Sequence, residues 1–187
     1  MMKRILAAIT MIAAVGSAAG AQAGSARGAQ GIPELESVTR QRLAITRGGM
    51  YVLGSWAVAN LLAGSIGYFV DPVRADFHLF NAGWNLVNLG LAAGSLLSAR
   101  NPRIPDSVTT EIREQHRIEK ILLVNVGLDV AYMTAGAFMA FGPFADEQIG
   151  QFGAALMIQG GFLFAFDIGL ALRHSRHREY ERFVDGL

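Results

Sequence analysis

The sequence predicts an all-α fold, an antiparallel bundle of four transmembrane helices with a short amphipathic helix before it. Of its 187 residues, 52% are hydrophobic and 17% are charged, which is apolar for a soluble domain. The charges leave four windows almost uncharged, each near the roughly 20 residues that a helix needs to cross a bilayer. These windows are residues 50–70, 77–99, 121–141 and 152–172. Near their middles lie single strongly polar residues, which are Asn60, Asn88, Asp129 and Gln159.

The first 23 residues have the layout of a secretory signal peptide. Lys3 and Arg4 precede an apolar run, and small residues follow up to Ala23. We expect cleavage after Ala23 or Ala21, because an apolar run of about 11 residues is too short to span a bilayer. The alternative is an uncleaved fifth helix.

The segment between the leader and the first window starts as a spacer of small residues. Pro33 can then begin a helix, because proline suits the first helical turn. Arg40, Arg42 and Arg47 would lie at the lipid headgroups. An interfacial amphipathic helix and a plain polar lead-in both fit this pattern.

Prolines and capping residues set the ends of the four spans. The first span ends before Pro72 and the second before Pro102, because proline disfavours a helical residue before it. Asp106 or Ser107 caps the third, which nothing breaks before Pro143, so it should extend out of the membrane. The predicted organisation is a signal peptide over 1–23, a spacer and interfacial segment over 24–48, the bundle over 49–173 and a basic juxtamembrane tail over 174–187.

Polar residues recur along one face of the second, third and fourth spans. An Asp at the centre of a membrane helix costs about 2.5–3.5 kcal/mol, so these residues should face the bundle interior. The candidate site comprises His78, Asn81, Asn85, Asn88, Asn125, Asp129, Gln159 and Asp167. One interpretation is a polar chamber that binds a small polar ligand, a cation or a proton. The other is a structural or accessory subunit in which these residues only fix helix packing, worth about 0.6–2 kcal/mol each.

Small residues also recur at four-residue spacing, which allows close helix contacts in lipid. The rows are Gly90, Gly94 and Ser98, then Gly127, Ala131 and Ala135, and last Gly161, Ala165 and Gly169. They predict packing within the chain, a homo-oligomer or a membrane partner.

Other titratable clusters give weaker signals for a metal. Glu111, Glu114, His116 and Glu119 have helical spacing, but they lack the paired Glu-x-x-His pattern of a di-iron site, so we predict a solvated charged face. His174 and His177 lie among arginines, which favours a basic lipid-facing anchor over a metal clip. His78 stands alone at its end of the spans, and haem needs two histidines at matched depth. No metal and no cofactor is expected.

Composition and motifs exclude further classes. The absence of cysteine excludes disulfides and thiol catalysis, and a net charge of +1 gives no field that would attract nucleic acid. No nucleophile and base converge in a known motif, so the sequence gives an enzyme no support.

Four segments resemble the motifs of an uncharacterised family of small bacterial multi-pass membrane proteins. They are residues 77–89, 114–122, 125–132 and 158–167. The resemblance implies a helical membrane fold in the bacterial inner membrane, with the lipid bilayer as partner, and no activity. Its motifs coincide with the polar face, which favours a site there.

Two rules disagree on orientation. Arginines and lysines flank the ends of the spans at the N-terminus, the long connection and the tail, which places those segments in the cytoplasm. A cleaved signal would place the mature N-terminus outside. We favour the signal because its three regions are well formed.

Overall fold

The computed structural model describes residues 33–143 and 145–184. They belong to one compact unit, Gly31–Leu187. The predicted signal peptide and most of the spacer lie outside the described residues.

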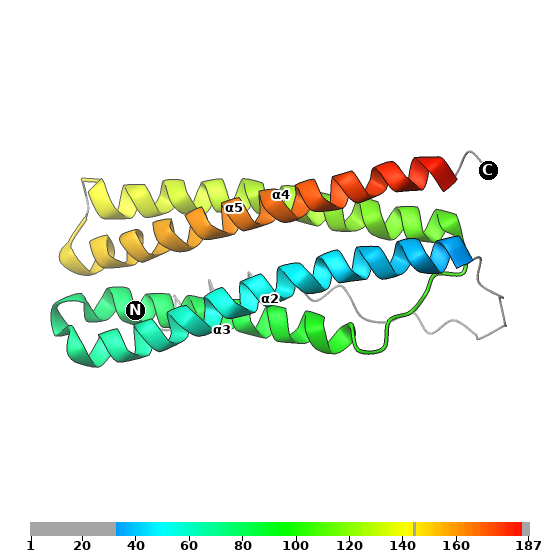
Figure 1. The fold of residues 1–187 in the computed structure, drawn as a ribbon. Helices are drawn as coiled ribbons and strands as arrows, with labels where there is room; N and C mark the ends of the chain where they lie inside the picture. The colour runs from blue at the N-terminus through cyan, green and yellow to red at the C-terminus, as the bar shows by residue number, and fades with distance from the viewer. Residues whose placement is uncertain (1–32, 144, 185–187) are drawn as a thin grey trace. The chain divides into compact units, whose positions relative to one another are not determined.

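The described part of the chain is helical and contains no strand (Figure 1), which confirms the all-α prediction. The elements are α2 (Pro33–Val70), the short 3-10 helix η1 (Pro72–Arg74), α3 (Ala75–Ser98), α4 (Val108–Phe141) and α5 (Glu147–Val184).

Helix α2 is one continuous helix, so the prediction of a separate short amphipathic helix is wrong. No proline lies between Pro33 and Pro72 to break it. The helix also continues through Gly48 and Gly49. Gly49 allows close contact with α5. A Cβ there would lie 2.9 Å from the Leu170 side chain.

The predicted helix ends are found for α2 and α4. Helix α2 ends just before Asp71 and Pro72. Ser107 caps α4 by accepting a hydrogen bond from the Thr110 amide at 3.3 Å. The prediction of a long, unbroken third helix is confirmed, since α4 runs from Val108 to Phe141.

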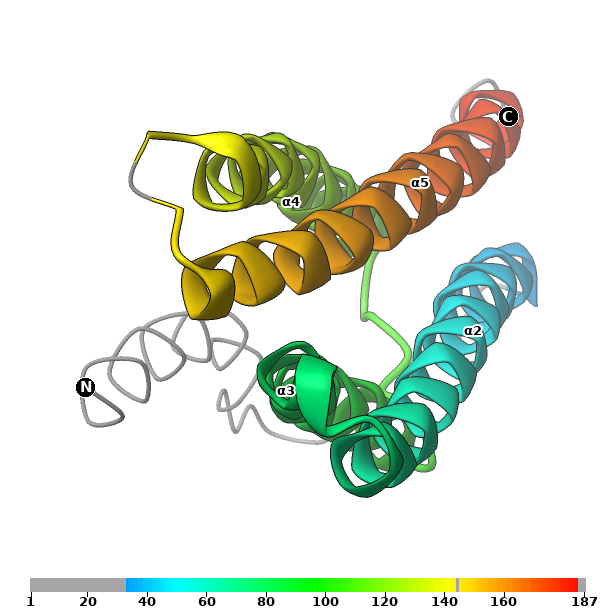
Figure 2. The same ribbon diagram turned by 90° about the vertical axis from the view of Figure 1, so that its left-hand side faces the viewer.

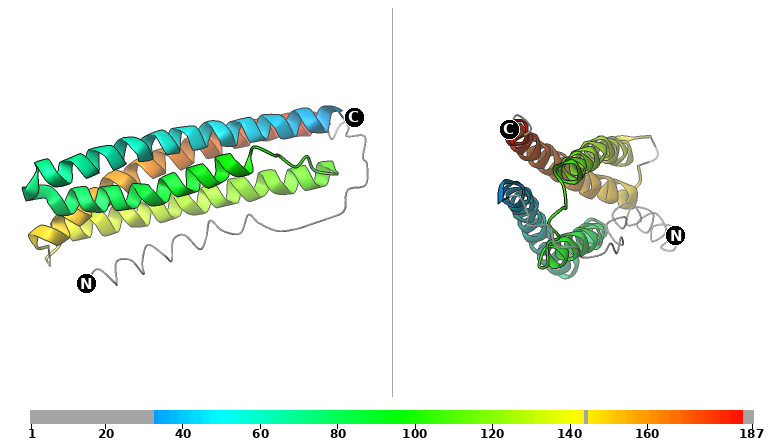
Figure 3. Two further views of the ribbon diagram at one scale, coloured as in Figure 1. Left: turned by 90° about the horizontal axis from the view of Figure 1, so that it is seen from below. Right: turned by 90° about the vertical axis from the view of Figure 1, so that its right-hand side faces the viewer.

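The helices pack as two pairs, α2 with α3 and α4 with α5, and α5 also contacts α2 and α3. Figures 2 and 3 show these pairs from three further sides. In the α4–α5 pair the backbones come close at two glycines. A Cβ on Gly153 would lie 2.5 Å from the carbonyl oxygen of Gly136, so only glycine fits at this crossing.

The predicted small-residue rows are not the positions where helices meet. A Cβ on Gly90, Gly94, Gly127 or Gly169 would have no neighbour within 4 Å. The close contacts use Gly64, Gly136, Gly153 and Gly160 instead. Apart from Gly161, where a Cβ would lie 3.9 Å from Met133 Sδ, the glycines of the rows therefore face outward in the single chain.

Large apolar side chains cover the outside, and the buried polar residues outnumber the buried apolar ones among the described residues. Three helices, α2, α4 and α5, are long and apolar enough to cross a membrane. This pattern indicates a membrane protein, because such a surface avoids water while the polar groups bond one another inside.

Candidate functional site

Most of the buried polar side chains, together with the half-buried Trp56 and Asn60, form three groups along the interior. We call Trp56, Asn60, Asn81 and Gln159 the amide network, and Asp129 with Asp167 the carboxylate pair. The third, the charged cluster, consists of Thr39, Arg42, Glu111, Gln115, His174 and His177.

The amide network links α2, α3 and α5. The indole nitrogen of Trp56 donates to Gln159 Oε1 at 3.0 Å. Gln159 Nε2 donates to Asn81 Oδ1, and Asn81 Nδ2 donates to Asn60 Oδ1 at 3.1 Å. Phe162 stacks on Trp56 with ring centroids 4.0 Å apart, which fixes the indole. The amide groups of Asn81 and Gln159 are thus both donating and accepting.

Two further asparagines continue this pattern along α3. Asn85 Nδ2 donates to the backbone oxygen of Asn81 at 2.9 Å, and Asn88 Nδ2 donates to Asn85 Oδ1 at 3.4 Å. All three asparagines are buried. Helix α3 therefore turns its polar face inward, as its heptad-like spacing predicts.

The carboxylate pair lies between α4 and α5. Asp129 and Asp167 are 2% and 4% exposed. The two carboxyl groups are near neighbours, and the Asn125 side chain lies close to Asp167. The Oδ2 atom of Asp129 is buried and has no hydrogen-bond partner. The pair thus differs from the amide network, because its bonding is incomplete.

His78 lies apart from these groups, at the end of the molecule where η1 joins α2 to α3. Its Nε2 is 3.7 Å from a carboxylate oxygen of Asp71. Gly67 makes room for the ring, since a Cβ there would lie 2.2 Å from His78 Nδ1.

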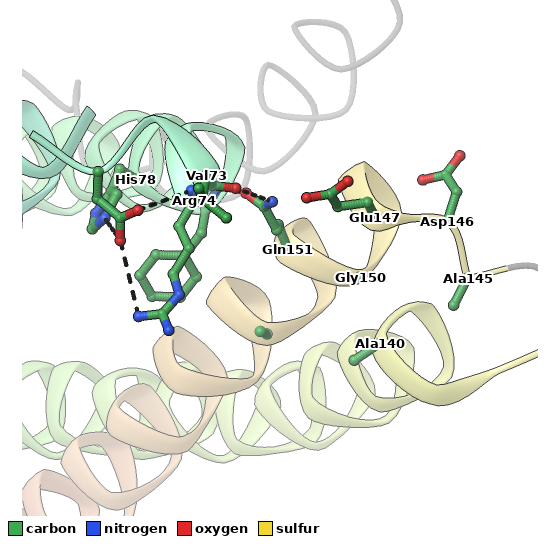
Figure 4. Close-up of a pocket in the computed structure, with 12 residues that line it drawn as sticks. Val73, Arg74, His78, Ala140, Ala145, Asp146, Glu147, Gly150 and Gln151 are labelled. Carbon is green, nitrogen blue, oxygen red and sulfur yellow. Dashed lines mark hydrogen bonds and ion pairs between the residues drawn. The ribbon is translucent and has the colours of Figure 1, made fainter. Parts of the chain in front are cut away.

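His78 lines an open pocket of about 660 Å³ at this end (Figure 4). Asp71 and Arg74 contribute from one side, and Gln151 of α5 donates to the Val73 carbonyl at 2.7 Å. The carboxylate pair does not line the pocket. The structure therefore brings together every predicted site residue except His78 in two groups, the amides and the carboxylates with Asn125.

The charged cluster joins the start of α2 to the start of α4 and the later part of α5. Arg42 reaches Glu111 with two nitrogens, one of them at 3.0 Å, and Thr39 donates to the same carboxylate at 3.0 Å. Gln115 Nε2 donates to the backbone oxygen of His174 at 2.7 Å. The prediction of a solvated face is wrong for Glu111, which is 1% exposed.

The two histidines of the cluster are buried too, so the prediction of a lipid-facing anchor is wrong for them. His174 Nδ1 hydrogen-bonds with Gln115 Oε1 at 3.4 Å, and its Nε2 hydrogen-bonds with Thr46 Oγ1 at 3.3 Å. His177 Nε2 donates to the Val38 carbonyl at 3.1 Å. These histidines follow Leu172, where the apolar window of α5 ends.

Burial sets the protonation of both histidines. Together with the nearby His177, Arg42 and Arg173, it lowers the pKa of His174 to about 4. Burial also lowers the pKa of His177, although its bond to Val38 acts in the opposite direction. Both imidazoles are therefore neutral at pH 7, which suits a cluster that already holds the buried cation Arg42.

A signal for the charged cluster was present in the sequence. On α4 the inward residues Glu111, Gln115 and Leu122 continue at heptad spacing into Asn125 and Asp129. The seam crosses the edge of the apolar window without a break. A search limited to the apolar windows misses it.

No cluster of three or more histidine, cysteine or acidic side chains suited to a metal occurs in residues 33–143 and 145–184. The polar groups in the interior that could hold a ligand are amides, two carboxylates and the paired charges of the charged cluster. This set suits the binding of a small cationic species at the carboxylate pair.

The fold and the interior define a helical protein with three helices long and apolar enough to cross a membrane, arranged around a polar seam. Residues 52–168 match a family of unknown function (DUF6992), and the chain belongs to that family. The matched segment contains all the predicted site residues. Comparisons with curated proteins and with solved structures found no match.

Proposed function

We propose that the protein is an integral membrane protein of four antiparallel spans whose interior binds a small cationic species, a proton or a metal cation, at the carboxylate pair. The observation that carries the proposal is the buried Oδ2 atom of Asp129, which lacks a hydrogen-bond partner beside a second carboxyl group. A membrane interior offers such an oxygen no water.

The pattern of exposure supports α3 as a fourth span. Its asparagines lower its hydropathy, yet they face inward, while Leu79, Leu86, Leu91 and Leu97 face outward at 43–63% exposure. A helix with a polar inner face and an apolar outer face can cross lipid within a bundle. Its 24 residues are also long enough.

Contacts between the helices support the antiparallel arrangement. Asn60 meets Asn81 across α2 and α3, and Gly136 meets Gly153 across α4 and α5. A short connection joins the two helices of each pair. Gln151, near the start of α5, donates a hydrogen bond to Val73 in the connection between α2 and α3. The ends of both pairs therefore meet on one side of the membrane.

The contrast between amides and carboxylates supports a site at the pair. The amide network is closed, so its members need no ligand and fit the packing role that polar residues have in membrane helices. Two buried carboxylates in contact repel each other, and the low dielectric strengthens that repulsion. A bound cation or proton removes it.

The location is part of the same proposal. A leader over residues 1–23 would direct the chain to the inner membrane of a bacterium, where the apolar outer faces contact lipid. The outward small-residue rows would then be free to meet a second copy or another membrane protein.

The test compares the purified chain with Asp129→Asn and Asp167→Asn in lipid vesicles. Proton uptake is followed with a pH indicator, and Na⁺, K⁺, Mg²⁺ and Ca²⁺ are titrated singly by calorimetry. We expect the wild type to bind one of these species and both variants to lose that binding. Asp106→Asn, at an exposed position, is the matched control. Unchanged binding in both variants with intact helix content would refute the proposal.

A further inference from the structure

We propose that the carboxylate pair holds a single shared proton, which bridges Asp129 and Asp167 and locks α4 to α5. This inference rests on the proposed function and names the species that the site binds. It assigns one proton to the two side chains together, since strongly interacting carboxyl groups titrate as a unit.

The geometry of the pair calls for one hydrogen-bond donor. Ionised carboxylates only accept hydrogen bonds, so two of them in contact leave each other without a donor. One proton converts one group into a donor and the other into its acceptor, which is a strong bond because the acceptor is charged. It also halves the charge that the interior must bury.

Asn125 completes the arrangement from the same helix as Asp129. Its side chain lies close to Asp167 and offers that group an amide N–H as a hydrogen-bond donor. The carboxylate oxygens of the pair therefore have two hydrogen-bond donors, the amide of Asn125 and the shared proton. Asn125 and Asp129 lie one turn apart on α4, so both reach across to α5.

The neighbouring groups supply no competing positive charge within the described residues. The titratable groups that act on Asp129 are Asp167 from α5 and Tyr132 from α4. From α3, Trp84 meets Tyr132 edge to face with ring centroids 5.2 Å apart. The nearest surroundings are thus carboxyl, phenol, amide and aromatic groups.

The donor set favours a proton over a metal cation. Ca²⁺ takes about 6–8 oxygen ligands and Mg²⁺ demands near-octahedral geometry. The pair and Asn125 offer few oxygens. The backbones also lie close together here, since a Cβ on Gly153 would lie 2.5 Å from the Gly136 carbonyl oxygen and one on Gly160 3.2 Å from the Asp129 carbonyl oxygen. A proton needs neither a cavity nor further ligands.

The test is infrared spectroscopy of the full chain in vesicles of phosphatidylcholine and phosphatidylglycerol. Protonated carboxyl groups have a carbonyl band that shifts in D₂O and that ionised groups lack. We expect the wild type at neutral pH to show one such band per chain, which disappears as the pH is raised. Asp129→Asn and Asp167→Asn should each shift the band, because the proton then lies on one carboxyl beside an amide and no longer bonds to a charged carboxylate.

Two results separate this inference from the proposed function. A wild type without the band, whose carboxylate bands respond to one of Na⁺, K⁺, Mg²⁺ or Ca²⁺, overturns the shared proton and leaves a cation site. A wild type with neither the band nor a response overturns both. Because these readings use the wild type alone, they hold even where a variant fails to fold. Asp106→Asn should retain the band, and its loss there would also count against the assignment.

Discussion

Replacing Glu111 with alanine should destabilise the protein strongly, because it leaves the guanidinium of Arg42 buried without its counter-ion. Arg42 is 7% exposed and Glu111 is 1% exposed. Removing one partner of such a buried pair costs about 3–5 kcal/mol. Thr39 also loses its acceptor, and a hydrogen bond to a charged group is worth about 1.5–3 kcal/mol. The two effects share one network and do not add fully, so we expect a loss of about 3–5 kcal/mol.

Two comparisons isolate the cause. Glu114→Ala removes a carboxylate from the same helix whose ion pair with Arg117 is 3.9 Å long and about half exposed. Such exposed pairs contribute about 0–1 kcal/mol. Replacing Arg42 with methionine and Glu111 with leucine together removes both charges and should recover most of the loss, since apolar replacement of a buried pair is often neutral.

The assay is reversible unfolding in mixed detergent micelles, followed by circular dichroism. The free energy of unfolding is compared among the wild type, the two single variants and the double variant. If Glu111→Ala costs no more than Glu114→Ala, the ion pair does not hold the ends of α2 and α4 together. If the double variant is as unstable as Glu111→Ala, the loss comes from packing rather than from the unpaired cation.

Two further predictions use the same assay. Burial next to His177 and Arg42 lowers the pKa of His174 to about 4, against 6.5 in the unfolded chain. As the pH drops, protons therefore bind His174 in the unfolded chain before the folded one, so the free energy of unfolding should fall between pH 6.5 and about 4. His174→Gln should weaken this pH dependence. An unchanged profile in that variant would show that His174 does not cause it. Gly153→Ala should cost about 1–3 kcal/mol by overpacking, because its Cβ would lie 2.6 Å from the Ala140 amide. Gly90→Ala, with open space around it, should not destabilise the protein, and equal effects of the two would refute the close crossing.

Local sequence features predicted the helices well. Ser107 and the prolines at 72 and 143 act at helix ends through their own backbone chemistry, so their effect is readable without a structure. The burial of the asparagines on α3 was predictable for a similar reason. A polar stripe at heptad spacing has one face, and lipid excludes it from the outside.

Heptad spacing on α4 places Glu111 and Gln115 on its inward face, but the ion pairing within the charged cluster was not predictable from that spacing. Arg42 and Glu111 lie 69 residues apart, and a charged residue alone favours water over burial. Only the tertiary pairing reverses that preference, since a partner and a hydroxyl satisfy the carboxylate. His174 was misjudged for the same reason, because the hydrogen bonds that bury it come from Gln115 and Thr46 on other helices.

The position of the carboxylate pair between two rigid contacts explains why its charge matters. On one side the charged cluster ties α4 to α5 through Gln115 and His174, and on the other Gly136 and Gly153 bring the two backbones together. Helices held at both ends cannot separate locally to let water reach Asp129. A change of charge at the pair must therefore be met by a bound proton or cation, or by a movement that breaks one of the two contacts. On the proposed function, the pair is the place in the interior where binding and helix packing would be coupled.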